Sequence, residues 1–312
     1  MKPRALFFGT PEFAVPSLDA LTLVADVVGC VCQPDRPSGR GMVLAPPPVK
    51  IRAEALGIPV VQPTKLRTGE FGVWVREQSV DVALVVAYGR ILPRDVLDGP
   101  RLGCVNVHAS LLPKYRGAAP ITWAVVSGES ETGITLMLLD EGMDTGKMLD
   151  KFVIKIDDTE TSGSLSSKLA ELGALATKVG VPKYISGGYA PVAQDDAAAS
   201  LAPMLKKEDG RIDWSKSAQA VHDHVRGMSP WPGAFTHAQG KPVKIHQTSV
   251  VRGIEPQAKS GEVLFADKSR LIIATGSGAV EVLSIQLEGK KAVRGVDWVM
   301  GRGIAIGDVL GT

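Results

Sequence analysis

Four largely apolar runs in the first third of the chain, each bounded by Gly, Pro or Asp, limit its fold more than any other feature. Such a run has no solvent-facing side, so the strand that it forms must be covered on both faces, as in a parallel sheet between helices. The segments between several runs have the three-to-four-residue spacing of helices. Strands alternating with helices predict a Rossmann-like α/β domain with a parallel sheet. The predicted strands are residues 5–8, 27–32, 82–87 and 104–107, and the predicted helices include residues 15–23, 49–56 and 165–179.

The second part of the chain has a different pattern. Residues 186–205 are rich in small residues, Gly and Pro, which is typical of a linker. A helix is predicted for residues 215–228, and the β-rich pieces that follow are separated by Gly-containing turns, as in a small barrel. We therefore expect an α/β domain at 1–189, a linker at 190–205 and an OB-like β-barrel domain at 206–312. The predicted barrel strands lie within residues 241–251, 261–266, 270–275 and 279–287.

Composition narrows the classes of protein to which the chain can belong. With 312 residues, of which 45% are hydrophobic and 22% charged, it can bury the cores of two domains, which argues against disorder. No stretch approaches the roughly 20 apolar residues of a membrane span, so we expect a cytoplasmic protein without membrane contact. Cys30, Cys32 and Cys104 lack a paired metal-ligand spacing, which predicts reduced, buried strand residues.

The net charge of +2 hides an asymmetry between the two predicted domains. Residues 206–312 carry 15 Lys and Arg against 11 Asp and Glu, whereas residues 1–205 carry 20 against 22. The predicted second domain is therefore the basic part of the chain. This bias is compatible with nucleic-acid contact, although a bias of this size is within ordinary variation.

Two polar residues interrupt the last predicted strand. In an extended strand Asn106 and His108 share a face, at the carboxyl end of the strand, where ligands bind in open α/β sheets. An amide and an imidazole can both donate hydrogen bonds to a carbonyl oxygen that becomes an oxyanion during acyl transfer. On spacing alone, a core pair with internal hydrogen bonds is an equally good interpretation.

A second polar segment, residues 138–146, follows the apolar run 134–139. Its two glycines and three carboxylates predict a loop at a strand end that can present Asp144 to a site. The alternatives are an acidic turn or a magnesium loop that uses Asp140, Glu141 and Asp144. Since the loop contains no His and lacks the alternating Asp/Asn spacing of a calcium loop, we predict no metal site.

Together these motifs resemble those of the folate-dependent formyltransferases. The resemblance rests on Asn106-x-His108, the following SLLPKYRGAAPI, and Asp144 within DEGMDTG. It implies that these three residues are the catalytic trio and that 10-formyltetrahydrofolate is the co-substrate. It also implies folate contacts from two stretches and from the loop that carries Asp144. The implied folate-binding residues are Tyr88, Gly89, Ile91, Leu92, Ser110, Leu111, Leu112, Pro113 and Asp140.

Further segments resemble the branch of this family that formylates initiator methionyl-tRNA, rather than the single-domain glycinamide ribonucleotide branch. They are FFGTPEFAVPSL, QPDRPSGRGMVLAPPPVK, IDWSKSA and SPWPGAF. The resemblance implies formation of N-formylmethionyl-tRNA for translation initiation, tRNA binding by residues 206–312, and a monomer. No NAD site is predicted, because Pro11 and Glu12 replace the second glycine of a dinucleotide-binding motif.

The proline-rich stretch 34–48 is predicted to be a long loop, too broken for helix or strand. The resemblance implies that it reaches the acceptor end of the tRNA and that Arg36 and Arg40 contact it. Met42 and Val43 stand where many relatives have lysines, so the loop is less basic than theirs. A purely structural loop is the alternative.

The chemistry that the resemblance implies begins with attack of the methionyl α-amine on the formyl carbon. Asn106 and His108 stabilise the oxyanion, and Asp144 either orients His108 or relays the proton of the amine. Three alternatives remain open at this point. They are formyl transfer to another amine, such as a sugar nucleotide or ribonucleotide, hydrolysis of formyl-folate, and RNA binding without catalysis.

Overall fold

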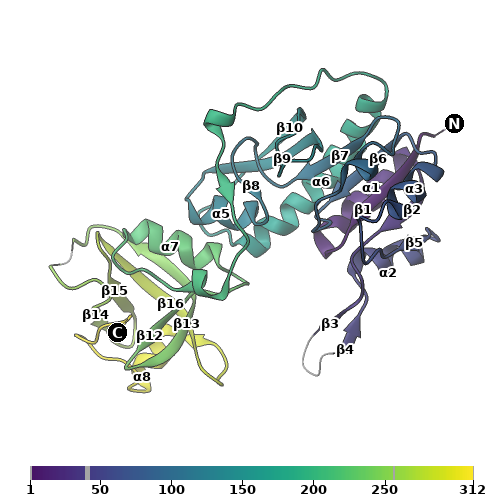
Figure 1. Ribbon diagram of the computed structural model, residues 1–312. Coiled ribbons are helices and arrows are strands. Elements are labelled where there is room, and N and C mark those ends of the chain that lie inside the picture. The colour runs from purple at the N-terminus through teal and green to yellow at the C-terminus, as the bar shows by residue number, and fades with distance from the viewer. Residues whose placement is uncertain (1, 39–42, 256, 312) are drawn as a thin grey trace. The chain divides into compact units, whose positions relative to one another are not determined.

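The computed structural model describes residues 2–38, 43–255 and 257–311, which divide into two compact units (Figure 1). The first unit comprises Met1–Pro120, Glu131–Lys155 and Ser166–Pro203, and the second comprises Ile121–Ser130, Ile156–Leu165 and Met204–Thr312. Two short stretches that lie well before Met204 in the chain thus belong with the C-terminal unit. The boundaries predicted above, which follow chain order, stay a prediction.

A seven-stranded sheet with the order β10-β9-β7-β6-β1-β2-β5 forms the centre of the first unit (Figure 1). The five strands from β7 to β5 are parallel, which confirms the predicted sheet. They are buried as the apolar runs require, and every residue of β6 and β7 is buried. These strands are β1 (Arg4–Gly9), β2 (Asp26–Val31), β5 (Val60–Val61), β6 (Val82–Val86) and β7 (Cys104–His108).

Helices cover both faces of this sheet. An ideal Cβ on Gly173 of α6 would lie 3.2 Å from Val107, so α6 packs on the Val107 face of β7. Cys104 alternates to the other face, where its Sγ lies 4.0 Å from the Val96 carbonyl of α4. Asn106 and His108 belong to the Cys104 face. The helices of this unit are α1 (Val15–Val24), α2 (Pro48–Ala55), α3 (Glu70–Glu77), α4 (Arg94–Leu97) and most of α6 (Ser162–Ile185).

An antiparallel hairpin extends the sheet beyond β7. β9 (Glu131–Leu138) pairs antiparallel with β7, and β10 (Met148–Lys155) pairs antiparallel with β9. A short connection can join adjacent strands only in this sense, because a parallel pair needs a crossover of a dozen or more residues. Residues 139–147 form the connection, so the hairpin holds both ends of the loop that contains Asp144 beside β7.

The prediction that residues 34–48 form neither helix nor strand was wrong. β3 (Arg36–Ser38) and β4 (Val43–Ala45) pair antiparallel, and α2 begins at Pro48. A separate two-stranded ribbon leaves one edge of each strand unpaired, so Pro37, which has no N–H, does not interrupt a larger sheet. Arg40 and Met42 lie outside the described residues.

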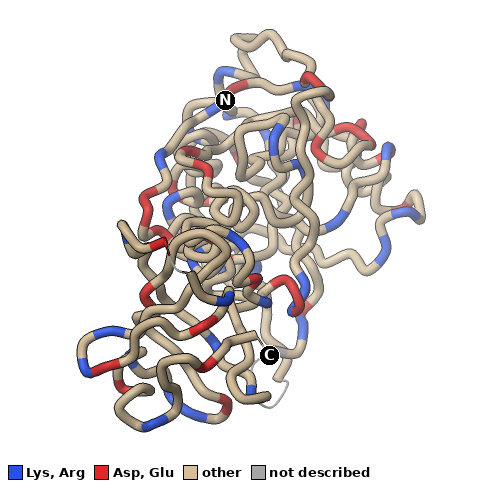
Figure 2. Tube along the Cα trace, turned by 90° about the vertical axis from the view of Figure 1, so that its left-hand side faces the viewer, with Lys and Arg blue, Asp and Glu red and all other residues tan. Residues whose placement is uncertain are grey.

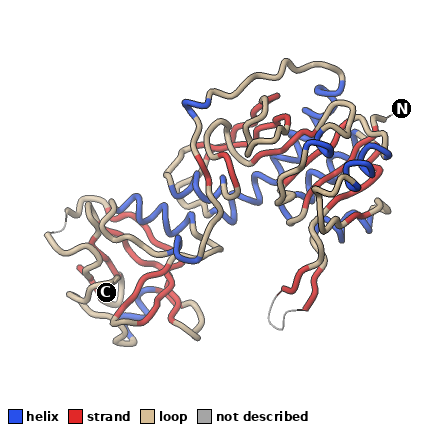
Figure 3. Tube along the Cα trace, viewed as in Figure 1, coloured by secondary structure: helices blue, strands red, loops and turns tan. Residues whose placement is uncertain are grey.

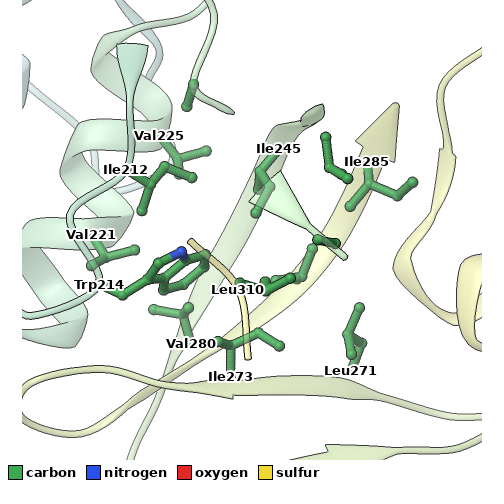
Figure 4. Close-up of a cluster of buried hydrophobic side chains, with 14 of the residues drawn as sticks. Ile212, Trp214, Val221, Val225, Ile245, Leu271, Ile273, Val280, Ile285 and Leu310 are labelled. Carbon is green, nitrogen blue, oxygen red and sulfur yellow. The ribbon is translucent and has the colours of Figure 1, made fainter. Parts of the chain in front are cut away.

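The second unit contains the antiparallel strands predicted for the C-terminal part, curled into a half-barrel (Figure 3). Their order is β12-β13-β16-β15-β14, and β17 pairs with β16. Apolar side chains from the sheet and from α7 fill its centre, with the Nε1 of Trp214 donating to Thr236 Oγ1 at 2.9 Å (Figure 4). The elements of this unit include α5 (Pro120–Val126), α7 (Ala218–Gly227), β12 (Phe235–Ala238), β13 (Lys241–Val251), β14 (Val263–Ala266), β15 (Leu271–Ala274), β16 (Ala279–Leu287), β17 (Val293–Arg294) and α8 (Gly295–Met300).

Within the residues that the structure describes, no helix has the length and apolarity to cross a membrane.

A buried ion pair explains why residues 156–165 belong to the second unit. Asp223 and Arg226 of α7 are paired at 2.7 Å, with side chains only 4% and 7% exposed. The Arg226 guanidinium also donates to the Glu160 carbonyl at 3.1 Å. Next to it, Ser162 Oγ donates to the Gly227 carbonyl at 2.6 Å. These contacts attach the 156–165 stretch to the end of α7.

Replacing Asp223 with Ala should lower the free energy of unfolding by about 3–5 kcal/mol, because it leaves the Arg226 charge buried without its partner. Urea denaturation of the full chain measures this loss. Asp297→Ala is the matched control, since Asp297 forms an Asp–Arg pair with Arg294 at the same sequence spacing on the surface of the same unit. Asp297→Ala should lower the free energy of unfolding only slightly. Equal losses in the two variants would show that burial of the Asp223–Arg226 pair adds nothing to its contribution to stability.

Candidate active site

Asn106 and His108 lie two residues apart at the end of β7, only 9% and 6% exposed. Their shared face confirms the strand geometry expected from the sequence. Within the described part of the chain, no hydrogen bond involves the side-chain amide of Asn106. The oxygen and nitrogen of this amide are not among the fully buried polar atoms that lack a partner, so they reach solvent, where a ligand or water can bind them. The interpretation of Asn106 as half of a self-satisfied core pair therefore does not hold.

Both ring nitrogens of His108 face oxygen atoms of the protein. Nε2 lies 3.0 Å from the Tyr115 carbonyl oxygen, and Nδ1 lies 3.6 Å from Asp144 Oδ1. A neutral ring with its hydrogen on Nε2 donates to Tyr115 and leaves Nδ1 without a hydrogen, whereas an imidazolium carries a hydrogen toward each oxygen. The interaction of His108 with Asp144 is thus strongest when the ring is charged.

Asp144 adopts a backbone conformation that is unusual for a residue with a side chain. Its φ is +55°, in the left-handed region, which non-glycine residues seldom occupy. Its carboxylate, 15% exposed, accepts a hydrogen bond at 2.8 Å from the amide of Gly117 in β8 (Arg116–Gly117). One carboxylate oxygen therefore faces β8, and the other faces His108. The structure brings the three predicted catalytic residues to one place.

Residues 110–115 follow β7 and are fixed largely by Thr135 of β9. Thr135 Oγ1 donates to the Ser110 carbonyl at 2.6 Å and accepts from the Leu112 amide at 3.1 Å. The Ser110 hydroxyl donates to the Lys114 carbonyl at 2.7 Å. Ser110 and Leu112 are fully buried, so their side chains shape this loop from within. Of the predicted folate-binding residues in this stretch, Leu111 and Pro113 keep partly exposed surface.

The predicted pterin-side stretch has both buried and exposed members. The ring of Tyr88 packs edge-on against Phe8 at a centroid separation of 5.5 Å, and burial raises the pKa of Tyr88 to about 12. Its carbonyl oxygen accepts hydrogen bonds from Thr10 and Gln33, so it is already engaged within the protein. Leu92 is buried and Ile91 is 56% exposed. Gly89 and Ile91 are therefore more open to a ligand than Tyr88.

A cavity of about 260 Å³ lies between α4, the start of β7 and the beginning of the Asp144 loop. Cys104 in its wall is on the same face of β7 as Asn106. Asp140 also lines it, with a carboxylate that accepts from Gly142 N at 3.0 Å and from Thr145 Oγ1 at 2.8 Å. The lining combines apolar residues with the charged Arg94, Asp98, Asp140 and Glu141, and such a combination can bind an organic ligand with polar groups. The cavity is lined by Arg94, Leu97, Asp98, Leu102, Gly103, Cys104, Leu138, Leu139, Asp140 and Glu141.

The cysteines and the acidic loop are the remaining groups for which metal or thiol chemistry was considered. All three cysteines are free and buried, as predicted, and Cys30 and Cys104 lie in strands, whereas Cys32 directly follows the end of β2. Burial raises the pKa of Cys32 to about 11 and that of Cys104 to about 12, so neither thiol ionises readily near neutral pH. Among the described residues, no three His, Cys, Asp or Glu side chains are placed to hold a metal ion.

Comparison with known proteins agrees with this geometry. Residues 3–178 match the family profile described as formyl transferase, and residues 204–303 match the formyl transferase C-terminal domain. The chain belongs to the formyl transferase family. It is therefore an enzyme, and the resemblance inferred from Asn106, His108 and Asp144 is confirmed.

Relatives of this formyl transferase match it over nearly the full length of both chains. A methionyl-tRNA formyltransferase of Sorangium cellulosum is 52% identical over 99% of this chain and 99% of its own. Those of Geotalea uraniireducens and Myxococcus xanthus are each 46% identical, over 99% and 98% of this chain and 98% and 97% of their own.

Solved structures share the fold of this formyl transferase at lower sequence identity. An N-formyltransferase from Helicobacter canadensis, in complex with folinic acid and dTDP-3-aminofucose, is 17% identical, with a TM-score of 0.66 over 90% of this chain and 99% of that chain. HypX from Aquifex aeolicus, in complex with tetrahydrofolic acid, is 18% identical, with a TM-score of 0.59 over 97% of this chain and 47% of that chain.

The remaining predicted site residues are Arg36 and Arg40, for which contact with tRNA was predicted. Arg36 is exposed at the start of β3, with a guanidinium nitrogen 3.4 Å from Gln33 Oε1, whereas Arg40 lies outside the described residues. Sequence analysis missed Tyr115, Gly117 and Thr135, which contact His108, Asp144 and the 110–115 loop. A signal existed for Thr135, since it is a polar residue within an apolar run and pairs with His108 across β7 and β9.

Gly117→Ala should lower the rate of formyl transfer about 10- to 100-fold while the protein still folds. Gly117 has φ +125°, and a Cβ there would lie 2.6 Å from the Ala202 carbonyl oxygen, so β8 must shift and carry its amide away from Asp144. Steady-state kinetics measures the effect. Gly57→Ala is the control, because Gly57 also has positive φ but has nothing within 4 Å of an added Cβ. Similar rates for both variants would show that the Gly117 contact does not matter.

Proposed function

We propose that this enzyme transfers the formyl group of 10-formyltetrahydrofolate to the α-amine of initiator methionyl-tRNA, giving N-formylmethionyl-tRNA for translation initiation. The observation that carries the proposal is the meeting of Asn106, His108 and Asp144 at the end of β7. Three relatives named methionyl-tRNA formyltransferase, 46–52% identical over at least 98% of the chain, support the choice of acceptor.

The proposed reaction begins with attack of the amine on the formyl carbon. An α-amine has a pKa of about 7.7–8.0, so a substantial share is already an uncharged nucleophile near neutral pH. The formyl oxygen becomes an oxyanion in the tetrahedral intermediate, which collapses with expulsion of the folate nitrogen. The buried amide of Asn106, which lacks an internal partner among the described residues, is suited to donate a hydrogen bond to that oxygen.

His108 and Asp144 are proposed to act on the same step, in which the oxyanion forms. Because both nitrogens of His108 face protein oxygens, donation to the formyl oxygen requires that one of these contacts be exchanged for the substrate. The carboxylate of Asp144, whose Oδ1 lies 3.6 Å from Nδ1, is placed to orient the ring for that exchange. With one oxygen on Gly117 and the other toward His108, Asp144 can also relay the proton that the amine loses to the departing folate nitrogen, directly or through water.

The folate substrate is proposed to bind along the Cys104 face of β7. The 260 Å³ cavity offers an apolar surface for a flat heterocycle, with Asp140 and Arg94 among its lining residues. Gly89 and Ile91, which are exposed, and Leu111 and Pro113, which are partly exposed, are the predicted folate-binding residues with surface that a ligand can contact. The fully buried Ser110, Leu112 and Leu92 support these loops from within.

We propose that each of the two units contributes its own contacts to the tRNA. In the first unit the β3–β4 hairpin exposes Arg36, together with Val43 and Leu44, which are 70% and 66% exposed. In the second unit, Lys and Arg outnumber Asp and Glu by 15 to 11 over residues 206–312, although Figure 2 shows both signs along the trace. We further propose that the enzyme acts as a monomer in the cytoplasm.

Asn106→Ala should lower kcat by about 100- to 1,000-fold, the usual cost of losing an oxyanion donor, with little change in folate affinity. Asn106→Asp is the matched variant, since it keeps the shape but replaces the donor with a carboxylate that only accepts. It should be at least as impaired as Asn106→Ala. Steady-state kinetics and folate titration measure the two effects. Near-normal turnover by either variant would reject the role of Asn106.

An acceptor comparison tests the proposed substrate. With a labelled formyl donor, the enzyme should formylate charged initiator methionyl-tRNA and leave an amino-sugar nucleotide unmodified. tRNA binding should weaken steeply with salt, because each neutralised phosphate contributes to the salt dependence. Faster transfer to the amino-sugar nucleotide would favour a sugar N-formyltransferase. Release of formate without an acceptor would favour a hydrolase, and tRNA binding without turnover would favour an RNA-binding protein.

A further inference from the structure

Gln194 places its side-chain amide among three groups of the active site. Its Nε2 donates to the carbonyl oxygen of Asp144 at 2.7 Å and to that of Gly146 at 2.8 Å. Its Oε1 accepts from the Arg116 guanidinium at 3.0 Å. One side chain therefore joins β8 to the loop on either side of Thr145. Only an amide can both accept from Arg116 and donate twice, because a carboxylate has no hydrogen and an ammonium has no lone pair.

The segment that carries Gln194 is itself fixed to the first unit. Residues 190–205 were predicted to be a linker, but β11 (Leu201–Ala202) within them pairs parallel with β8. The Arg116 amide donates to the Ser200 carbonyl at 2.8 Å, and the Arg116 guanidinium, itself buried, pairs with Asp196 at 2.7 Å. Gln194 thus approaches Asp144 from a rigid support rather than from a free connection.

The conformation of Asp144 explains what this support does. A left-handed backbone is disfavoured for a residue with a Cβ, so neighbouring contacts must hold it. The Gly117 amide holds the Asp144 carboxylate, and Gln194 holds the Asp144 carbonyl. Without Gln194 the peptide can relax to a more common conformation. Since the carboxylate projects from the same residue, its oxygen would then move away from His108.

We propose that Gln194 is a positioning residue that keeps the Asp144 carboxylate directed at His108 by fixing the backbone of the Asp144 loop. The inference rests on the proposed function, because the position of Asp144 matters to turnover only if Asp144 takes part in formyl transfer. The hydrogen bonds of Gln194 go to the Asp144 loop and to Arg116 of β8, so we expect it to act on the reaction through the position of Asp144.

Gln194→Met retains the length of the side chain and removes all three hydrogen bonds. We expect kcat to fall about 10- to 100-fold, with KM for folate and for methionyl-tRNA changed less than about twofold, because misplacement of a catalytic group affects the chemical step. Gln78→Met is the matched control. Gln78 also donates from Nε2 to a backbone carbonyl of the first unit, that of Trp74 at 3.1 Å, without contacting the site. Its kcat should match that of the unmodified enzyme.

A double-mutant cycle distinguishes positioning from general stabilisation. In an Asp144→Ala background there is no carboxylate to place, so adding Gln194→Met should lower kcat no further, although it still lowers the melting temperature. Gln194→Glu provides a second variant should Gln194→Met fold poorly. It can pair with Arg116 but cannot donate to the loop, so it should show the same loss of kcat.

The outcomes separate this inference from the proposed function. Unchanged kcat in Gln194→Met and Gln194→Glu, alongside a nearly inactive Asp144→Ala enzyme, would overturn the positioning role and leave the proposed function standing. Losses of kcat that multiply in the double variant would also overturn it, because Gln194 would then act independently of Asp144. Full activity of Asp144→Ala would overturn both the catalytic assignment of Asp144 and the role of Gln194.

Discussion

The hydrogen bond from the Gly117 amide to the Asp144 carboxylate is the contact on which the site depends. It fixes one carboxylate oxygen at 2.8 Å and leaves the other directed at His108. Two further features are needed for it to form. β8 must lie close to β11, which the lack of a side chain at Gly117 permits, and Asp144 must adopt its left-handed backbone. The antiparallel hairpin of β9 and β10 holds both ends of the loop and so limits its movement.

Burial strengthens the polar interactions that the groups of this site make. A hydrogen bond or charge in a site with little water is stronger than the same group in solvent, and an unpaired amide there is costly. The amide of Asn106 has no internal partner within the described residues, yet it still reaches solvent. A formyl oxygen bound there would take the place of water. The Asp223–Arg226 pair of the second unit is buried to a similar degree, yet every one of its contacts is internal, as suits a structural role.

Much of the fold and the identity of the trio could be predicted from the sequence. The apolar runs at β1, β2 and β6 have no polar face, which requires a sheet covered on both sides. Strand alternation alone puts Asn106 and His108 on one face of β7. Local composition marked the Asp144 loop as polar and Gly-rich. These are properties of neighbouring residues in the chain, and they do not depend on the rest of the molecule.

The contacts that complete the site join distant segments, and only the tertiary structure decided them. Gln194 is separated from Asp144 by 50 positions, and Gly117 by 27, so no local pattern connects them. For the same reason the Gly- and Pro-rich stretch around Gln194 resembles a linker in sequence, although its backbone is hydrogen-bonded to β8. The sequence by itself determined which residues are candidates for catalysis and which strand carries two of them. The tertiary structure determined how they are held, because hydrogen-bond partners far apart in the chain meet only after the sheet has formed.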